Sequence, residues 1–265
     1  MLELRVGGLP FPHGGPDGEW RYRHAVWREG PTDLDRQAVA DFLDYEEANG
    51  RTVAVIVDPA LSDWREWGRP AVRPVPGSCP TQCCSHVYSE GCSALLMCHG
   101  APVSALADIL DQGVLRASTT LTGRTGQDLS GSSSWGEPPD YFDYVMLANG
   151  RCLAPEAVAL SRLVGRDLVP ADLSPGYPPA ARLYFRWDTL AALQGASFDG
   201  VHPVKVRSEL PLDETLVGVV VPDGTDVESF PTRFADRVVA IPAQDPSPEE
   251  WATRAATEAS QLPGP

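Results

Sequence analysis

The chain has 265 residues, 43% of them hydrophobic and 22% charged, which is an ordinary composition for one large globular domain or a domain with an appendage. Its formal net charge of −15 repels a phosphate backbone, so we do not expect duplex DNA as a partner. The longest apolar runs, such as LVGVVVP at 216–222, suit strands rather than membrane spans, and the amino-terminal segment lacks the pattern of a secretory signal, so we expect a cytoplasmic protein with no membrane partner.

Residues 1–77 predict a small α/β appendage followed by a linker. Apolar residues between Asp33 and Asn49 recur at the spacing of one helix face, and Gly50 stands where the helix would end. TVAVIVD at 52–58 then has the continuous apolar character of a buried strand.

The next stretch, CPTQCCSHVYSEGC at 79–92, is rich in cysteine. Zinc needs four thiolate or imidazole ligands, and we name Cys79, Cys83, Cys84 and Cys92 as metal candidates. The two-residue spacing of a CxxC knuckle is missing, so unpaired loop thiols are the alternative. Stable disulfides are not expected in a reducing cytoplasm.

Residues 78–245 are predicted to form the main domain. ALLMCH at 94–99 predicts a strand with Cys98 in the core, and a helix capped by Ser104 and ended by Gly113 follows. Residues 117–140 are polar and have no apolar period, which indicates a loop before DYFDYVML at 140–147.

The last third of the chain predicts strands and one terminal helix. Ser247 and Glu250 have capping-box spacing, so we assign 246–265 to a carboxyl-terminal helix and tail. Helices and strands do not alternate regularly, which favours an α+β domain with mixed, mostly antiparallel sheets over a doubly wound fold. The predicted strands are 181–187, 201–207, 215–221 and 237–241.

His99 is the residue that we single out for function. It ends a predicted strand and is followed by Gly100, where backbone can approach a ligand closely. A capped helix then begins within a few residues, so the segment reads strand, His-Gly, helix.

The stretch LLMCHG…VSALADILDQGVLRAS resembles the first motif of the ADP-ribosyltransferase fold, in its His-Tyr-Glu branch and the related DNA-modifying toxin group. The resemblance implies that His99 and Gly100 orient NAD. DYFDYVML is similar to the family's second block, which implies that Tyr141 or Phe142 stacks on nicotinamide. Arg124 is placed like the arginine that some members use against the NAD phosphates.

VHPVKVRSELPLDETLVGVVVPDG at 201–224 is similar to the family's final pair of strands. The register of the resemblance puts Pro203, beside His202, where the family carries its catalytic glutamate, and Glu209 is the most available acid. A carboxylate facing the ribose carbon would stabilise the positive charge that builds as nicotinamide leaves.

The resemblance therefore implies a glycosyltransferase-class enzyme that binds NAD and transfers ADP-ribose to an acceptor, or hydrolyses NAD, and it leaves the acceptor open. Two other interpretations stand beside it. One is a metal-stapled, cysteine-rich interaction module without catalysis, and the other is a thiol-dependent biosynthetic enzyme that uses Cys83 or Cys84.

Overall fold

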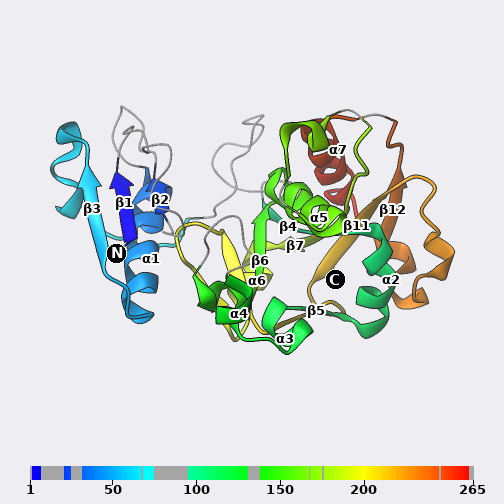
Figure 1. Cartoon of the computed structure of the whole chain (residues 1–265), viewed down its shortest axis with the longest axis horizontal. Helices are drawn as coiled ribbons and strands as arrows, with labels where there is room; N and C mark the ends of the chain where they lie inside the picture. The colour runs from blue at the N-terminus through cyan, green and yellow to red at the C-terminus, as the bar shows by residue number, and fades with distance from the viewer. Residues whose placement is uncertain are drawn as a thin grey trace.

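The computed structural model describes residues 2–6, 21–24, 32–66, 68–74, 95–130, 138–166, 168–174, 176–244 and 246–262. Figure 1 shows a small amino-terminal unit in blue beside a larger unit coloured green to red. The small unit is a parallel sheet in the order β2-β1-β3, made of β1 (Leu2–Val6), β2 (Arg21–His24) and β3 (Val53–Val57). Helix α1 (Asp33–Ala48) packs on it, and Val39 and Phe42 join Leu4 and Val6 in a small core.

The sequence predicts α1 and β3 at nearly their observed bounds, but the prediction that β3 is buried is wrong. Most of its residues are half-buried and Ile56 is exposed. The reason is its place in the sheet, because β3 pairs with β1 and has no second neighbour among the described strands.

The larger unit is built on a seven-stranded sheet in the order β12-β11-β7-β4-β6-β9-β8. Neighbouring strands run antiparallel except β11 and β12, which confirms the predicted mixed, mostly antiparallel sheet. A separate antiparallel ribbon joins β5 (Val114–Arg116) to β10 (Glu209–Pro211). The strands of the sheet are β4 (Leu96–Ala101), β6 (Tyr144–Asn149), β7 (Ala181–Arg186), β8 (Ala196–Ser197), β9 (Val204–Arg207), β11 (Leu216–Pro222) and β12 (Val238–Ile241).

One face of this sheet is covered by α2 (Val103–Gln112), whose Leu106 and Leu110 are completely buried. The helix ends at Gly113 as predicted, with φ of 67° in the left-handed region. The predicted cap is wrong, because the helix already begins after Pro102 and Ser104 lies inside its first turn.

The other face is covered by α5 (Ala154–Val164) and α7 (Pro248–Ala259). Ser247 and Glu250 form the predicted capping box at the start of α7. Trp251 is completely buried against this face, so α7 is part of the core of the larger unit. The remaining short elements are η1 (Pro59–Leu61), η2 (Trp64–Glu66), η5 (Pro170–Leu173), α6 (Trp187–Ala191), η6 (Val227–Ser229) and η7 (Thr232–Arg237).

The segment expected to be a loop at 117–140 contains regular structure. It forms α3 (Ser118–Thr122) and α4 (Gly126–Ser130), and η4 (Pro139–Asp143) completes it after residues outside the described range. A Cβ atom at Gly126 would come within 2.7 Å of the Pro139 carbonyl carbon, so α4 lies directly on η4. The polar sequence hides this packing because the contact is made by backbone rather than by apolar side chains.

Candidate functional site

The seven-stranded sheet divides beside His99. The ladder between β4 and β6 consists of Met97 opposite Asn149 and Cys98 opposite Ala148, and it stops there although both strands continue. Strand β4 stays paired with β7 as far as Ala101, whereas β6 pairs with β9. The sheet therefore forks, with β4-β7-β11-β12 on one side and β6-β9-β8 on the other.

His99 lies at this fork and bonds across it. Its Nδ1 is 3.1 Å from the carbonyl oxygen of Met146 on β6. A carbonyl oxygen only accepts, so Nδ1 donates, and the neutral ring offers Nε2 as an acceptor. Burial, assisted by the positive charge of Arg162, lowers the pKa of His99 to about 4, so the ring is neutral near pH 7. No group in the described part of the chain bonds to Nε2.

Gly100, the residue after His99, has a packing role. A Cβ atom here would overlap the Pro155 carbonyl oxygen and come within 2.9 Å of the Pro155 Cβ. The first turn of α5 thus rests on the backbone of β4. The close approach predicted at Gly100 is made in this structure by α5, and a contact between Gly100 and NAD stays a prediction.

A buried ion pair fixes α5 in this position. Arg182 on β7 and Glu156 on α5 are both almost completely buried, with Nη1 2.9 Å from Oε1. Arg182 also donates to the carbonyl oxygens of Gly150 and Cys152, and Glu156 accepts from the Ala180 amide. Every charged oxygen and most guanidinium donors therefore have partners, as buried charges require.

Tyr141 and Phe142 lie together in η4 but differ in exposure. Tyr141 is completely buried, and its ring is surrounded by the Lys205 ammonium at 3.9 Å and by the ring edges of Tyr45 and His202. Phe142 is half-buried and keeps accessible surface. Of the two predicted stacking residues, Phe142 is the one that a ligand can reach without displacing protein contacts.

Arg124 and Glu209 both lie at the surface. Arg124, between α3 and α4, donates from Nη2 to the Asp128 carbonyl oxygen at 2.7 Å. Glu209 begins β10, is 49% exposed, and pairs with Arg116 on β5 at 3.0 Å. Within the described residues, the Glu209 side chain bonds to Arg116 and not to His99 or Tyr141. The structure thus brings Tyr141 and Phe142 together but does not join the predicted acid to them.

Backbone strain at Ser208 sets the position of Glu209. Ser208 has φ of 62°, the one positive value among the described non-glycine residues. Its amide donates to the Asp143 carbonyl oxygen and its own carbonyl accepts from Ala117, which ties η4 to the β5–β10 ribbon. Such strain persists only where neighbouring contacts hold it.

A buried charged group around Lys205 was not predicted from the sequence. Lys205 is the single lysine of the chain, and its side chain is completely buried. Its Nζ lies 2.9 Å from Asp199 Oδ2, at angles outside those of a hydrogen bond. The same atom lies 3.5 Å from the ring centre of Tyr45 and 4.6 Å from that of Tyr144. Together with Tyr141 these rings form a tyrosine cage around the ammonium.

Asp199 pairs with the ammonium inside the tyrosine cage. Its Oδ1 accepts from the amides of Val201 and His202, and its Oδ2 lies 3.0 Å from His202 Nδ1. Burial opposes ionisation, but the neighbouring His202 and Lys205 outweigh it and hold the pKa of Asp199 below its usual range. Burial lowers the pKa of Lys205, and Asp199 opposes that shift.

The sequence contains one signal for this group: a lone lysine within the apolar strand VKVR, whose alternation puts Lys205 on the opposite face from Val204 and Val206. Ordinarily that face would be solvated. Tyr45 comes from α1, about 160 positions earlier in the chain, so local pattern does not predict that it covers Lys205.

The cysteines divide into two groups. Cys98 is completely buried and burial raises its thiol pKa to about 12, which confirms it as a core residue. The four metal candidates Cys79, Cys83, Cys84 and Cys92 lie outside the described residues, so zinc stays a prediction. Within the described ranges, no three His, Cys, Asp or Glu side chains are grouped to hold a metal ion, and no helix has the length and hydropathy to cross a membrane.

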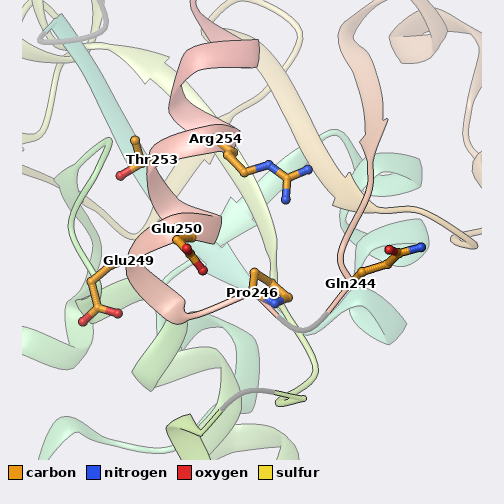
Figure 2. Close-up of a pocket in the computed structure, with 6 residues that line it drawn as sticks. All are labelled: Gln244, Pro246, Glu249, Glu250, Thr253 and Arg254. Carbon is orange, nitrogen blue, oxygen red and sulfur yellow. The ribbon is translucent and has the colours of Figure 1, made fainter.

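A surface depression lies away from these residues, at the start of α7 (Figure 2). Its lining includes Glu249, Glu250 and Arg254. Glu250 is engaged with the Ser247 amide in the capping box, and the two carboxylates at the helix start disfavour an anionic ligand. We therefore place the candidate site at the fork rather than in this depression.

Comparison of the chain with protein-family models, with curated proteins and with solved structures finds no match in any of the three.

Proposed function

We propose that the chain binds NAD at the fork of the sheet and breaks its bond to nicotinamide, passing ADP-ribose to an acceptor or to water. The observation that carries this proposal is the division of the sheet at His99, which leaves a neutral imidazole with an unengaged acceptor nitrogen between two strands. An unengaged imidazole nitrogen of this kind can accept a hydrogen bond from a ligand hydroxyl.

The proposal gives a role to four of the predicted residues, His99, Phe142, Arg124 and Glu209. His99 Nε2 accepts a hydrogen bond from a ribose hydroxyl, and Phe142 rather than buried Tyr141 offers a ring to nicotinamide. Arg124 is exposed and pairs with the phosphates once it releases the Asp128 carbonyl oxygen. Glu209 is the proposed acid, and it must exchange its contact with Arg116 for the ribose.

Calorimetric titration with NAD tests the proposal. We compare the wild-type protein with His99→Asn, because an asparagine amide can still donate to the Met146 carbonyl oxygen while the Nε2 acceptor is removed. Loss of one hydrogen bond to the ligand is expected to weaken NAD binding about tenfold. Thr253→Ala serves as the control, because Thr253 lines the depression of Figure 2 and is expected to leave the affinity unchanged.

Two results would contradict the proposal. One is an absence of both heat and thermal stabilisation of the wild-type protein at millimolar NAD. The other is binding that Thr253→Ala abolishes and His99→Asn leaves intact, which would place the nucleotide at the start of α7.

A further inference from the structure

His202 and Asp199 form an oriented pair next to the tyrosine cage. The His202 Nδ1 lies 3.0 Å from Asp199 Oδ2, and the side chain of His202 is 19% exposed while that of Asp199 is completely buried. Within the described residues, nothing bonds to the His202 Nε2. The imidazole is therefore held through Nδ1, and its Nε2 has no partner in the described part of the chain.

The pair has the electronic arrangement of a proton acceptor. A carboxylate only accepts hydrogen bonds, so Nδ1 carries the ring proton and the lone pair is on Nε2. When Nε2 takes a proton, the resulting imidazolium faces the Asp199 carboxylate, which stabilises it. Asp199 cannot readily rotate away, because two backbone amides and the Lys205 ammonium hold its oxygens.

The charged and titratable groups around His202 are few. Asp199 belongs to its own loop, Lys205 comes from β9, and the ring of Tyr141 from η4 lies steeply inclined to the imidazole, with centroids 5.7 Å apart. His202 and the Lys205 ammonium both lower the pKa of Asp199, and Tyr141 restricts the tilt of the imidazole. His202 thus contacts the residue that precedes Phe142 in η4, and Phe142 is the ring that we assign to nicotinamide.

We propose that His202 accepts the proton of a water molecule that attacks the ribose carbon of NAD. This inference rests on the proposed NAD site. One O–H bond of water breaks, and its proton goes to Nε2. The oxygen forms a bond to C1′ of the ribose, while the electron pair of the C1′–nitrogen bond leaves with nicotinamide. The products are ADP-ribose and neutral nicotinamide, and the proton then passes from His202 to solvent.

A purely structural role makes a different prediction. If His202 serves only to satisfy Asp199, then the Nδ1 contact is all that matters. Asparagine offers an amide donor near the position of Nδ1 but has nothing at the position of Nε2. His202→Asn therefore separates the two roles, and His202→Ala creates a space that added imidazole can fill.

The experiment measures nicotinamide release from NAD, NAD affinity and the unfolding midpoint for the wild-type protein and both variants. We expect His202→Asn to keep the wild-type midpoint and affinity and to lose activity by about 100-fold or more, the usual effect of removing a general base. Imidazole is expected to restore part of the activity to His202→Ala and none to Glu209→Gln, in which the histidine is intact.

The outcomes separate this inference from the proposed function. Wild-type protein that binds NAD without releasing nicotinamide overturns the role of His202 in hydrolysis and leaves NAD binding standing. Activity of His202→Asn within about threefold of wild type also overturns that role, since general-base loss costs far more. Wild-type protein that does not bind NAD overturns both proposals.

Discussion

Lys205 shows how much one residue can depend on distant parts of the chain. Removing an ammonium from water is costly, and each of the three rings of the tyrosine cage returns about 2 kcal/mol. The Asp199 carboxylate at 2.9 Å has to offset most of the remainder. Neither charge is stable in this position alone, so we expect Asp199 and Lys205 to behave as a unit.

Lys205→Met tests this dependence. The methionine side chain fills a similar volume but leaves Asp199 as a buried carboxylate that has lost its cation, and we expect the free energy of unfolding to fall by about 3 kcal/mol. Chemical denaturation measures the change. Arg207→Met on the same strand is the control, because Arg207 is exposed and its loss should change stability by no more than about 0.5 kcal/mol. Equal stability of the two variants would show that the buried pair contributes nothing.

His99 predicts a specific loss of stability in acid. Its pKa is lowered from 6.5 to about 4 in the folded protein, so the unfolded chain takes up the proton first as the pH falls. Stability is unaffected above pH 6.5, declines between 6.5 and 4, and declines no further below 4 on account of this group. The full effect is at most about 3.5 kcal/mol, since one pKa unit corresponds to about 1.4 kcal/mol.

Unfolding in denaturant at a series of pH values checks this prediction against His99→Asn, which cannot titrate. The difference in unfolding free energy between the two proteins should shift in favour of the variant as the pH falls through this window. A difference that stays constant with pH would mean that folding does not perturb the titration of His99.

At the scale of elements, the contact between β4 and α5 shapes the fork. The helix can lie on the strand only because Gly100 has no side chain, and the Glu156–Arg182 pair holds it there. The amino-terminal turn of α5 is thus fixed next to the residue that follows His99.

Gly100→Ala is expected to lower the free energy of unfolding by about 2 kcal/mol, the usual cost of overpacking a well-packed contact. The new Cβ would overlap the Pro155 carbonyl oxygen, so α5 has to move. Thermal or chemical denaturation measures the loss. Gly68→Ala is the control, because a Cβ atom there meets nothing within 4 Å, and its stability should equal that of wild type. Wild-type stability of Gly100→Ala would mean that α5 does not rest on β4 as described.

The elements that sequence reasoning predicts best are those with local signals. The capping box of α7 and the apolar period of α1 lie within single segments, and both helices occur where expected. Helices α3 and α4 escape prediction because each is short and its contacts with η4 are not local: Gly126 of α4 lies against the Pro139 backbone, and the Thr119 hydroxyl of α3 donates to the Phe142 carbonyl oxygen. The prediction that His99 ends its strand is wrong, because β4 continues to Ala101, and the fork beside His99 is not visible in the sequence, since it depends on where two ladders stop.

Prediction from local sequence signals has the same limit at the tyrosine cage. The sequence singles out Tyr141 as an aromatic residue of interest, yet its burial against Lys205 depends on α1, η4 and β9 meeting in space. The sequence indicates Glu209 as the available acid. It does not indicate the Asp199–His202 pair, because a turn of the backbone brings these two side chains together.

At the scale of the whole molecule, the amino-terminal unit is docked on the larger one. Tyr45 of α1 caps the tyrosine cage, and Arg51 forms ion pairs with Glu46 of α1 and with Asp140 of η4. Arg73 stacks on the ring of Phe198 at 3.9 Å. The contacts thus reach the loop that carries Asp199 and His202.

Gly200 lies against α1 in this docking, and Gly200→Ala tests whether the two units depend on one another. Its φ is 72°, and a Cβ atom would come within 2.9 Å of the Phe42 Cβ on α1 and overlap the Ala38 carbonyl oxygen. We expect the substitution to separate α1 from this loop. Hydrogen exchange should then become faster in peptides from α1 and from residues 199–205 together, while β7 and β11 keep their protection.

Gly224→Ala separates this effect from backbone strain. Gly224 has φ of 83° and a Cβ atom there meets nothing within 4 Å, so alanine brings the cost of a left-handed conformation without a collision. That variant should lose about 1 kcal/mol of stability and keep wild-type exchange in α1. If α1 exchanges equally slowly in both variants, the contact at Gly200 does not hold the units together. A third outcome is faster hydrogen exchange in α1 alone in Gly200→Ala. The loop with Asp199 and His202 is then ordered by the larger unit itself, and the amino-terminal unit has no part in positioning the histidine.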